Sequence, residues 1–84
     1  MKKLNLGCGS DYKKGWINVD FDRNYRADLY IDLRKKLPFG NNEIDYILAQ
    51  DIIEHFTREE GREFLHECFR VLKPDGVLIF KWNE

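Results

Sequence analysis

Two glycines and one aspartate carry the strongest chemical signal in this sequence. Gly7 and Gly9 follow residues 4–6, an apolar stretch typical of a short strand. Glycine permits a sharp turn and a close approach to a ligand that a Cβ atom would obstruct. Asp20 comes eleven residues after Gly9 and ends a second strand-like run, residues 16–20. In a parallel sheet the glycine turn and Asp20 lie side by side at the carboxyl edge, where nucleotides bind. The carboxylate can accept hydrogen bonds from a ribose diol.

The residues after the glycine turn argue against a dinucleotide site. The dinucleotide fingerprint places a third glycine three residues after the second, at the start of a helix. Here residues 10–12 are Ser, Asp and Tyr, and the next glycine is Gly15. A pyrophosphate would therefore be poorly supplied with donors, whereas other adenosine cofactors fit.

Other reactive side chains have an ordinary structural explanation as well. His55 can act as a general base because imidazole titrates near neutrality, or it can satisfy local backbone and carboxylate groups. Tyr12 can lie across a bound cofactor or pack elsewhere, and Trp16 and Trp82 are expected to pack. The two cysteines do not form a metal-binding pattern, so we predict structural thiols and no metal site.

The chain alternates strand-like and helical patterns, which indicates the α/β class with a mainly parallel sheet. Residues 28–33 alternate strictly, as expected of an edge strand, and residues 44–49 are apolar enough for a central one. Thr57 and Glu60 form a capping box that starts one long helix before the last strand. Its apolar positions are Phe64, Leu65, Cys68, Phe69, Val71 and Leu72.

The end of the chain is predicted to be a turn followed by a strand. Residues 73–76 have proline second and glycine fourth, as in a type I turn. Residues 77–80 read as a buried strand with nothing after it to pair with, which leaves an open apolar edge. We therefore expect self-association through this strand. The short connections between the earlier strands also predict that one sheet face is thinly covered.

Composition describes one small domain, residues 1–84, without a general attraction for polyanions. Fourteen basic and fifteen acidic side chains give a net charge of −1, so no specific nucleic-acid or anionic-membrane signal is present. No apolar run approaches the roughly 20 residues of a membrane span. The start, Met1 to Lys3, lacks the apolar stretch of a signal peptide, and a cytoplasmic location is expected.

Five ordered pieces of the sequence resemble the class I S-adenosylmethionine-dependent methyltransferases, in particular their short-linker bacterial branch. They are LNLGCG (4–9), GWINVD (15–20), DL with LPF (32–33 and 37–39), IDYI with EH (44–47 and 54–55) and RVLKPDGVL (70–78). The resemblance implies a Rossmann-like sheet of about five strands in the order 3-2-1-4-5. Because the family's last two strands are missing, it implies a truncated methyltransferase core.

The resemblance also implies S-adenosylmethionine as the cofactor and S-adenosylhomocysteine as the product. It places Gly7 and Gly9 beside the methionyl part and Asp20 on the ribose hydroxyls. The rest of the implied site comprises Asp32 and Leu33 at the adenine, Gln50 and Asp51 near the transferred methyl group, and the neighbours Cys8 and Phe21.

The implied activity is methyl transfer to an acceptor that the sequence does not identify. His55 and Asp51 are the candidate catalytic residues. By themselves, the 84 residues are expected to bind cofactor weakly at most and not to catalyse methyl transfer. Two other classes stay open. One is a non-catalytic Rossmann-like nucleotide-binding module, and the other is a truncated pseudo-enzyme that acts through protein contacts.

Overall fold

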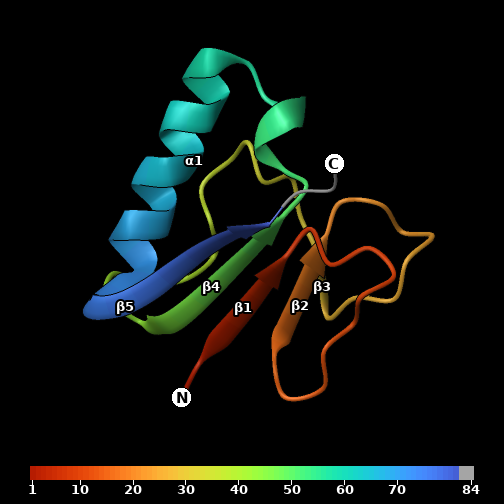
Figure 1. Cartoon of the computed structure of the whole chain (residues 1–84), viewed down its shortest axis with the longest axis horizontal. Helices are drawn as coiled ribbons and strands as arrows, with labels where there is room; N and C mark the ends of the chain where they lie inside the picture. Colours follow the sequence, from red (N-terminus) through yellow and green to blue (C-terminus); the bar gives the residue numbers. More distant parts are fainter. Residues whose placement is uncertain (82–84) are drawn as a thin grey trace.

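Five parallel strands form one sheet in the computed structural model, which describes residues 1–81. The strands are β1 (Lys3–Leu6), β2 (Ile17–Asp20), β3 (Leu29–Tyr30), β4 (Ile44–Gln50) and β5 (Leu72–Lys81). Their order is β3-β2-β1-β4-β5, and every pair is parallel, so all carboxyl ends meet at one edge (Figure 1). The expected α/β class and strand order are confirmed.

One long helix, α1 (Arg58–Val71), lies against the sheet at its β4 and β5 end (Figure 1). It begins after Thr57, whose side chain accepts from the Glu60 N–H while its own N–H donates to the Glu60 carboxylate. The capping box is thus confirmed, and a short 3₁₀ helix, η1 (Ile53–His55), precedes it. Within residues 1–81 no helix is long and apolar enough to cross a membrane.

The core lies between α1 and the central strands. Leu4 and Leu6 of β1 are fully buried and belong to one apolar cluster with Phe64 and Cys68 of α1. On the opposite face, the half-buried Trp16 packs edge-on against a tyrosine of β4 at a ring-centroid distance of 5.4 Å. Trp82 lies outside the described residues.

The helix buries a narrower stripe than its apolar positions suggest. Phe64, Cys68 and Val71 are its buried residues, spaced by four and three positions. Leu65 is half-buried and Phe69 is 63% exposed, because both lie beside this stripe rather than on it. Leu72 is buried, but it is the first residue of β5.

Two strand predictions need correction. The edge strand expected over 28–33 pairs regularly only at Leu29–Tyr30, because its partner β2 ends at Asp20. The expected turn at 73–76 lies inside β5 as an irregularity: pairing advances from Leu72 to Val77 while β4 advances by two residues. Such extra residues bulge out of the ladder without ending the strand.

The last strand is an edge strand within residues 1–81, not a buried central one. Val77 is 44% exposed and Ile79 is 40% exposed, on the face opposite α1, while Leu78 and Phe80 pack against the core. Residues 77–80 carry apolar side chains on both faces of the strand, but only the face toward α1 is covered. The expected thin coverage of one sheet face is therefore present at β5.

Candidate functional site

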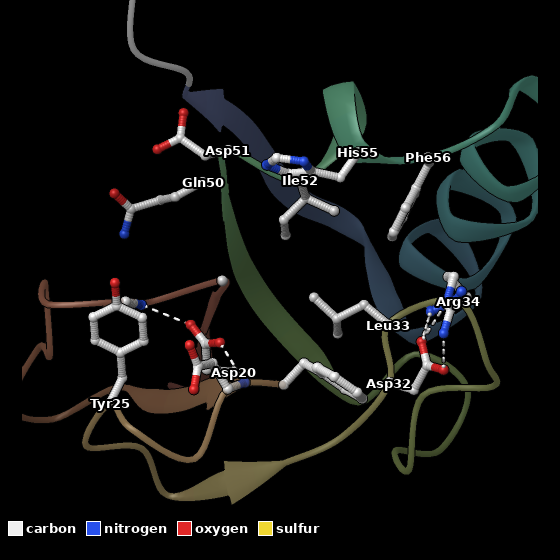
Figure 2. A pocket seen from close by; sticks show the side chains of 14 residues that line it. Asp20, Tyr25, Asp32, Leu33, Arg34, Gln50, Asp51, Ile52, His55 and Phe56 are labelled. Atoms are coloured by element: carbon white, nitrogen blue, oxygen red, sulfur yellow. Dashed lines mark hydrogen bonds and ion pairs between the residues drawn. The ribbon is translucent and has the colours of Figure 1, made fainter.

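A cavity of about 580 Å³ opens at the carboxyl edge of the sheet (Figure 2). Its walls come from the segments that follow β1, β2, β3 and β4 and from η1. Its size is that of ordinary small-molecule sites, about 300–1,000 Å³. The lining residues are Gly7, Gly9, Asp20, Phe21, Asp22, Tyr25, Asp32, Leu33, Arg34, Gln50, Asp51, Ile52, His55 and Phe56.

The glycine turn after β1 requires glycine for two different reasons. Gly7 has φ +68°, and a Cβ atom there would lie 2.5 Å from the backbone oxygen of Gln50. Gly9 has φ +51°, but a Cβ there would meet nothing within 4 Å. The N–H groups of Gly7 and Cys8 both donate to the Val19 oxygen, at 2.8 and 3.1 Å, which fixes the turn against β2.

Asp20 connects the tip of β2 to the glycine turn. One carboxylate oxygen accepts from the Gly9 N–H at 2.8 Å, and the other accepts from the Asp22 N–H at 2.9 Å (Figure 2). A carboxylate offers about four acceptor positions, so each oxygen keeps capacity for another donor. Asp20 can therefore hold the turn and accept hydroxyl donors from a ligand in the cavity.

Asp32 and Arg34 form a two-pronged ion pair on another wall of the cavity (Figure 2). The Arg34 Nε and Nη2 atoms donate to the two Asp32 oxygens, each at 2.9 Å. These hydrogen bonds lower the pKa of Asp32 to about 2. Next to this pair, the nearly buried Leu33 and Ile52 give the cavity apolar surface.

This ion pair predicts an acid-sensitive contribution to stability. Because the folded-state pKa of Asp32 is depressed from 3.8 to about 2, its contribution is present above pH 3.8 and is lost as the pH falls through 2. Urea unfolding between pH 5 and pH 2 should show a smaller loss of stability for Asp32→Asn than for the unchanged chain. Equal pH dependence in both proteins would contradict the pair's role.

The end of β4 supplies the wall opposite Asp32. Gln50 is only 8% exposed, and its Nε2 atom donates to the Asn5 side chain at 2.7 Å. Asp51 follows with φ +50°, while its N–H donates to the Lys81 oxygen at 2.8 Å. A non-glycine residue at positive φ is uncommon, and such residues cluster at functional sites.

Most residues selected from the sequence do meet at this cavity, but Cys8 does not line it. Its side chain is 2% exposed, and its Sγ atom donates to the Arg26 oxygen at 3.6 Å. Burial, followed by the charge of Asp20, raises the pKa of the thiol. Tyr12 is also directed elsewhere, since its hydroxyl donates to Asp28 at 2.7 Å.

Several lining residues were missed by the sequence analysis. Tyr25, which is 43% exposed, lines the cavity from the loop after β2. Arg34 could have been predicted as a partner of Asp32, because it lies two residues after it. The others are Asp22, Ile52 and Phe56.

The charge of the cavity wall favours a cationic ligand. Asp20, Asp22, Asp32 and Asp51 line it, and Arg34 is the guanidinium among the lining residues. Carboxylates on a concave wall raise the local concentration of cations and repel anions.

Residues 1–81 contain no cluster of three or more His, Cys, Asp or Glu side chains arranged to hold a metal ion.

A Rossmann-like sheet with its cavity at the carboxyl edge, beside a glycine turn and an aspartate, defines a nucleotide-type binding site. Residues 4–80 match the methyltransferase domain family, and the chain belongs to that family. A probable S-adenosylmethionine-dependent methyltransferase of Mycolicibacterium smegmatis is 29% identical over 93 aligned residues, covering 90% of this chain and 35% of that protein.

A solved structure shows the same fold. The crystal structure of the PH0226 protein from Pyrococcus horikoshii OT3 matches with a TM-score of 0.77 and 26% identity. The match covers 94% of this chain and 44% of that chain. The chain thus spans about a third of the curated relative and less than half of the solved one.

Proposed function

We propose that this chain is the cofactor-binding core of an S-adenosylmethionine-dependent methyltransferase, with S-adenosylhomocysteine as the product. The observation that carries the proposal is Asp20, which holds the Gly9 N–H and lines the same cavity as Gly7 and Gly9. A carboxylate at the end of β2 beside a glycine turn suits a ribose diol. The methyl acceptor is left open.

The cofactor-binding residues predicted from the sequence each have a proposed part in holding the cofactor. Gly7 and Gly9 leave room beside the methionyl part, and Asp20 accepts from the ribose hydroxyls. At the adenine we place Asp32, Leu33 and Phe21. Near the methyl group we place Gln50 and Asp51, while Cys8 contributes through its backbone alone.

The sulfonium of the cofactor supplies an already activated methyl group, so the protein must align the acceptor and exclude water. A base is needed only if the acceptor must lose a proton. His55 and Asp51 both line the cavity and are the proposed candidates. Because Val77 and Ile79 leave part of the sheet uncovered, we expect the 84 residues to bind cofactor without efficient turnover on their own.

Calorimetric titration of four compounds tests this proposal against a general nucleotide-binding module. We expect S-adenosylmethionine and S-adenosylhomocysteine to bind, and ATP and NAD to bind much more weakly, because the carboxylates of the wall repel phosphates. Added salt should weaken the binding of S-adenosylmethionine more than the binding of S-adenosylhomocysteine, because only the former carries a positively charged sulfur. Preferential binding of ATP or NAD would overturn the proposal. A pseudo-enzyme would bind S-adenosylmethionine without transferring its methyl group.

We further propose that residues 1–84 form one partial domain with a cytoplasmic location.

We also propose self-association through the edge of β5 that has no neighbouring strand within residues 1–81. An unpaired, apolar strand edge is a template for pairing with another chain. Ile79 is 40% exposed on that strand. Ile79→Lys should therefore shift the chain toward monomer in light scattering after size exclusion, whereas Lys81→Ala should not. A monomeric unchanged chain would refute self-association.

A further inference from the structure

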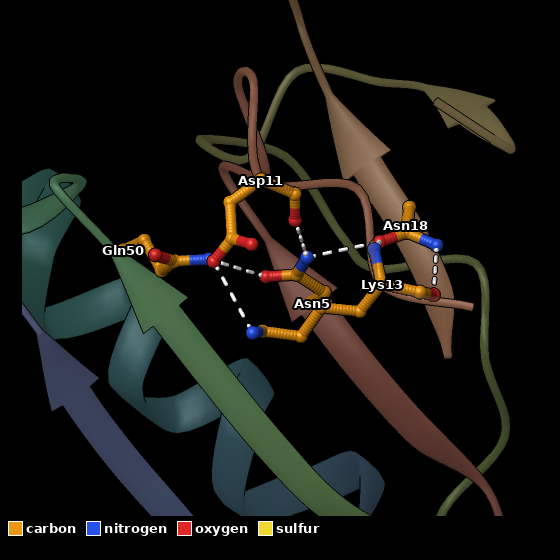
Figure 3. A network of polar contacts seen from close by, with 5 residues as sticks. All are labelled: Asn5, Asp11, Lys13, Asn18 and Gln50. Carbon is orange, nitrogen blue, oxygen red and sulfur yellow. Dashed lines mark hydrogen bonds and ion pairs between the residues drawn. The ribbon is translucent and has the colours of Figure 1, made fainter. Parts of the chain in front are cut away.

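Two neighbouring strands carry a buried asparagine in the middle of an apolar run. Asn5 of β1 and Asn18 of β2 are both 0% exposed, and they are direct partners in the parallel register. Burying an amide is costly unless its donors and acceptors are paired. The two side chains therefore need a specific set of partners, which Figure 3 shows.

Asn5 is the centre of this network. Its Nδ2 atom donates to the Asn18 Oδ1 atom at 2.9 Å and to the backbone oxygen of Asp11 at 2.8 Å. Its Oδ1 atom accepts from the Gln50 Nε2 atom at 2.7 Å. One side chain thus joins β1 to the end of β4, to β2 and to the loop after the glycine turn.

Asn18 completes the attachment of that loop. Its Oδ1 atom also accepts from the Lys13 N–H at 2.8 Å, and its Nδ2 atom donates to the Lys13 oxygen at 2.8 Å. The structure describes no helix between β1 and β2, so the backbone groups of residues 10–15 lack helical partners. The asparagine amides supply partners instead.

We propose that Asn5 is a positioning residue of the cofactor site, acting through the relay Gln50–Asn5–Asn18. The relay has one end on the cavity wall, at Gln50, and the other end on the loop that continues from Gly9. Asn5 and Asn18 themselves are not lining residues. Their amides hold the loop that follows the glycine turn, and Gln50, in one arrangement before ligand enters, which reduces the ordering cost of binding. The inference rests on the proposed cofactor function.

Nuclear magnetic resonance of the ¹⁵N-labelled 84-residue chain tests the relay during titration with S-adenosylhomocysteine. We expect the side-chain amide signals of Asn5 and Asn18 to shift with the same saturation curve as the backbone signal of Gly9. The side-chain amide signal of Asn41, which accepts from Arg70 and does not line the cavity, should stay unshifted. Shifts at Gly9 with unmoved Asn5 and Asn18 signals would overturn the relay. If no signal moves, the proposed function itself fails.

A matched pair of variants separates positioning from stability. Asn5→Ala should raise the dissociation constant for S-adenosylhomocysteine about fivefold or more, the equivalent of one hydrogen bond. Val71→Ala removes fully buried apolar atoms from α1, away from the relay, and should change affinity less than about twofold at a temperature where the protein is folded. Equal losses in both variants would overturn the proposal. If Asn5→Ala does not fold, Asn5→Ser is used instead, and the same rise in the dissociation constant is expected. The nuclear magnetic resonance titration of the unchanged chain tests the relay without any variant.

Discussion

Replacing Gly7 with alanine is expected to lower the free energy of unfolding by about 2–5 kcal/mol. The left-handed backbone at φ +68° costs a residue with a Cβ atom about 1–2 kcal/mol. The new Cβ atom would also lie 2.5 Å from the Gln50 oxygen, and forcing such neighbours apart costs about 1–3 kcal/mol. Because a domain of this size has a net stability of only about 4–13 kcal/mol, the variant should be largely unfolded at moderate urea concentrations.

Gly9→Ala is the matched control for this result. Gly9 shares the left-handed conformation, with φ +51°, but its added Cβ atom meets no atom within 4 Å. Only the conformational cost of about 1–2 kcal/mol should appear in urea unfolding followed by circular dichroism. Since Gly9 lines the cavity, this variant should lose cofactor affinity beyond its small loss of stability. Equal destabilisation by the two variants would mean that the close approach to Gln50 carries no energy.

Asp20→Asn is expected to weaken binding of S-adenosylhomocysteine by about 1.5–3 kcal/mol, a loss of roughly 10- to 150-fold. The carboxylate accepts from the N–H groups of Gly9 and Asp22 with different oxygens. An amide must turn its NH₂ group toward one of those donors, so the turn loosens at the same time as the ribose loses an acceptor. Calorimetry at fixed pH and salt measures the effect.

Asp75→Asn controls for the change in net charge. Asp75 is exposed on β5 outside the cavity lining, and its replacement should leave the affinity unchanged. Unfolding curves of both variants separate affinity from stability. An Asp20→Asn protein that binds as tightly as the unchanged chain would move the cofactor site away from β2.

Local features of the chain were predictable because their causes are local. The capping box at Thr57 depends on residues three positions apart, and strand character depends on alternating or continuous apolar runs. The glycine turn and Asp20 were also found, because the ends of parallel strands meet at one edge. The ion pair between Asp32 and Arg34 was within reach of the same reasoning, since the two residues are separated by one position.

Other features could not be predicted because they depend on which element covers a side chain. Cys8 turns into the protein while Tyr25, from a different loop, reaches the cavity. Phe69, Val77 and Ile79 are as apolar as core residues, yet each is exposed because no neighbouring element covers it within residues 1–81. Composition alone could not distinguish the covered positions from the uncovered ones.

The sequence by itself determined the α/β class, the parallel strand order through its family resemblance, and the glycine turn with Asp20. The class and the glycine turn follow from backbone stereochemistry and short-range periodicity, which each segment carries with it, whereas the strand order followed from the resemblance alone. Only the tertiary structure decided that Asn5, Asn18 and Gln50 join in one network. The reason is that a buried amide is stabilised by whichever donors and acceptors the neighbouring strands bring to it, and these lie up to 45 positions away in the chain.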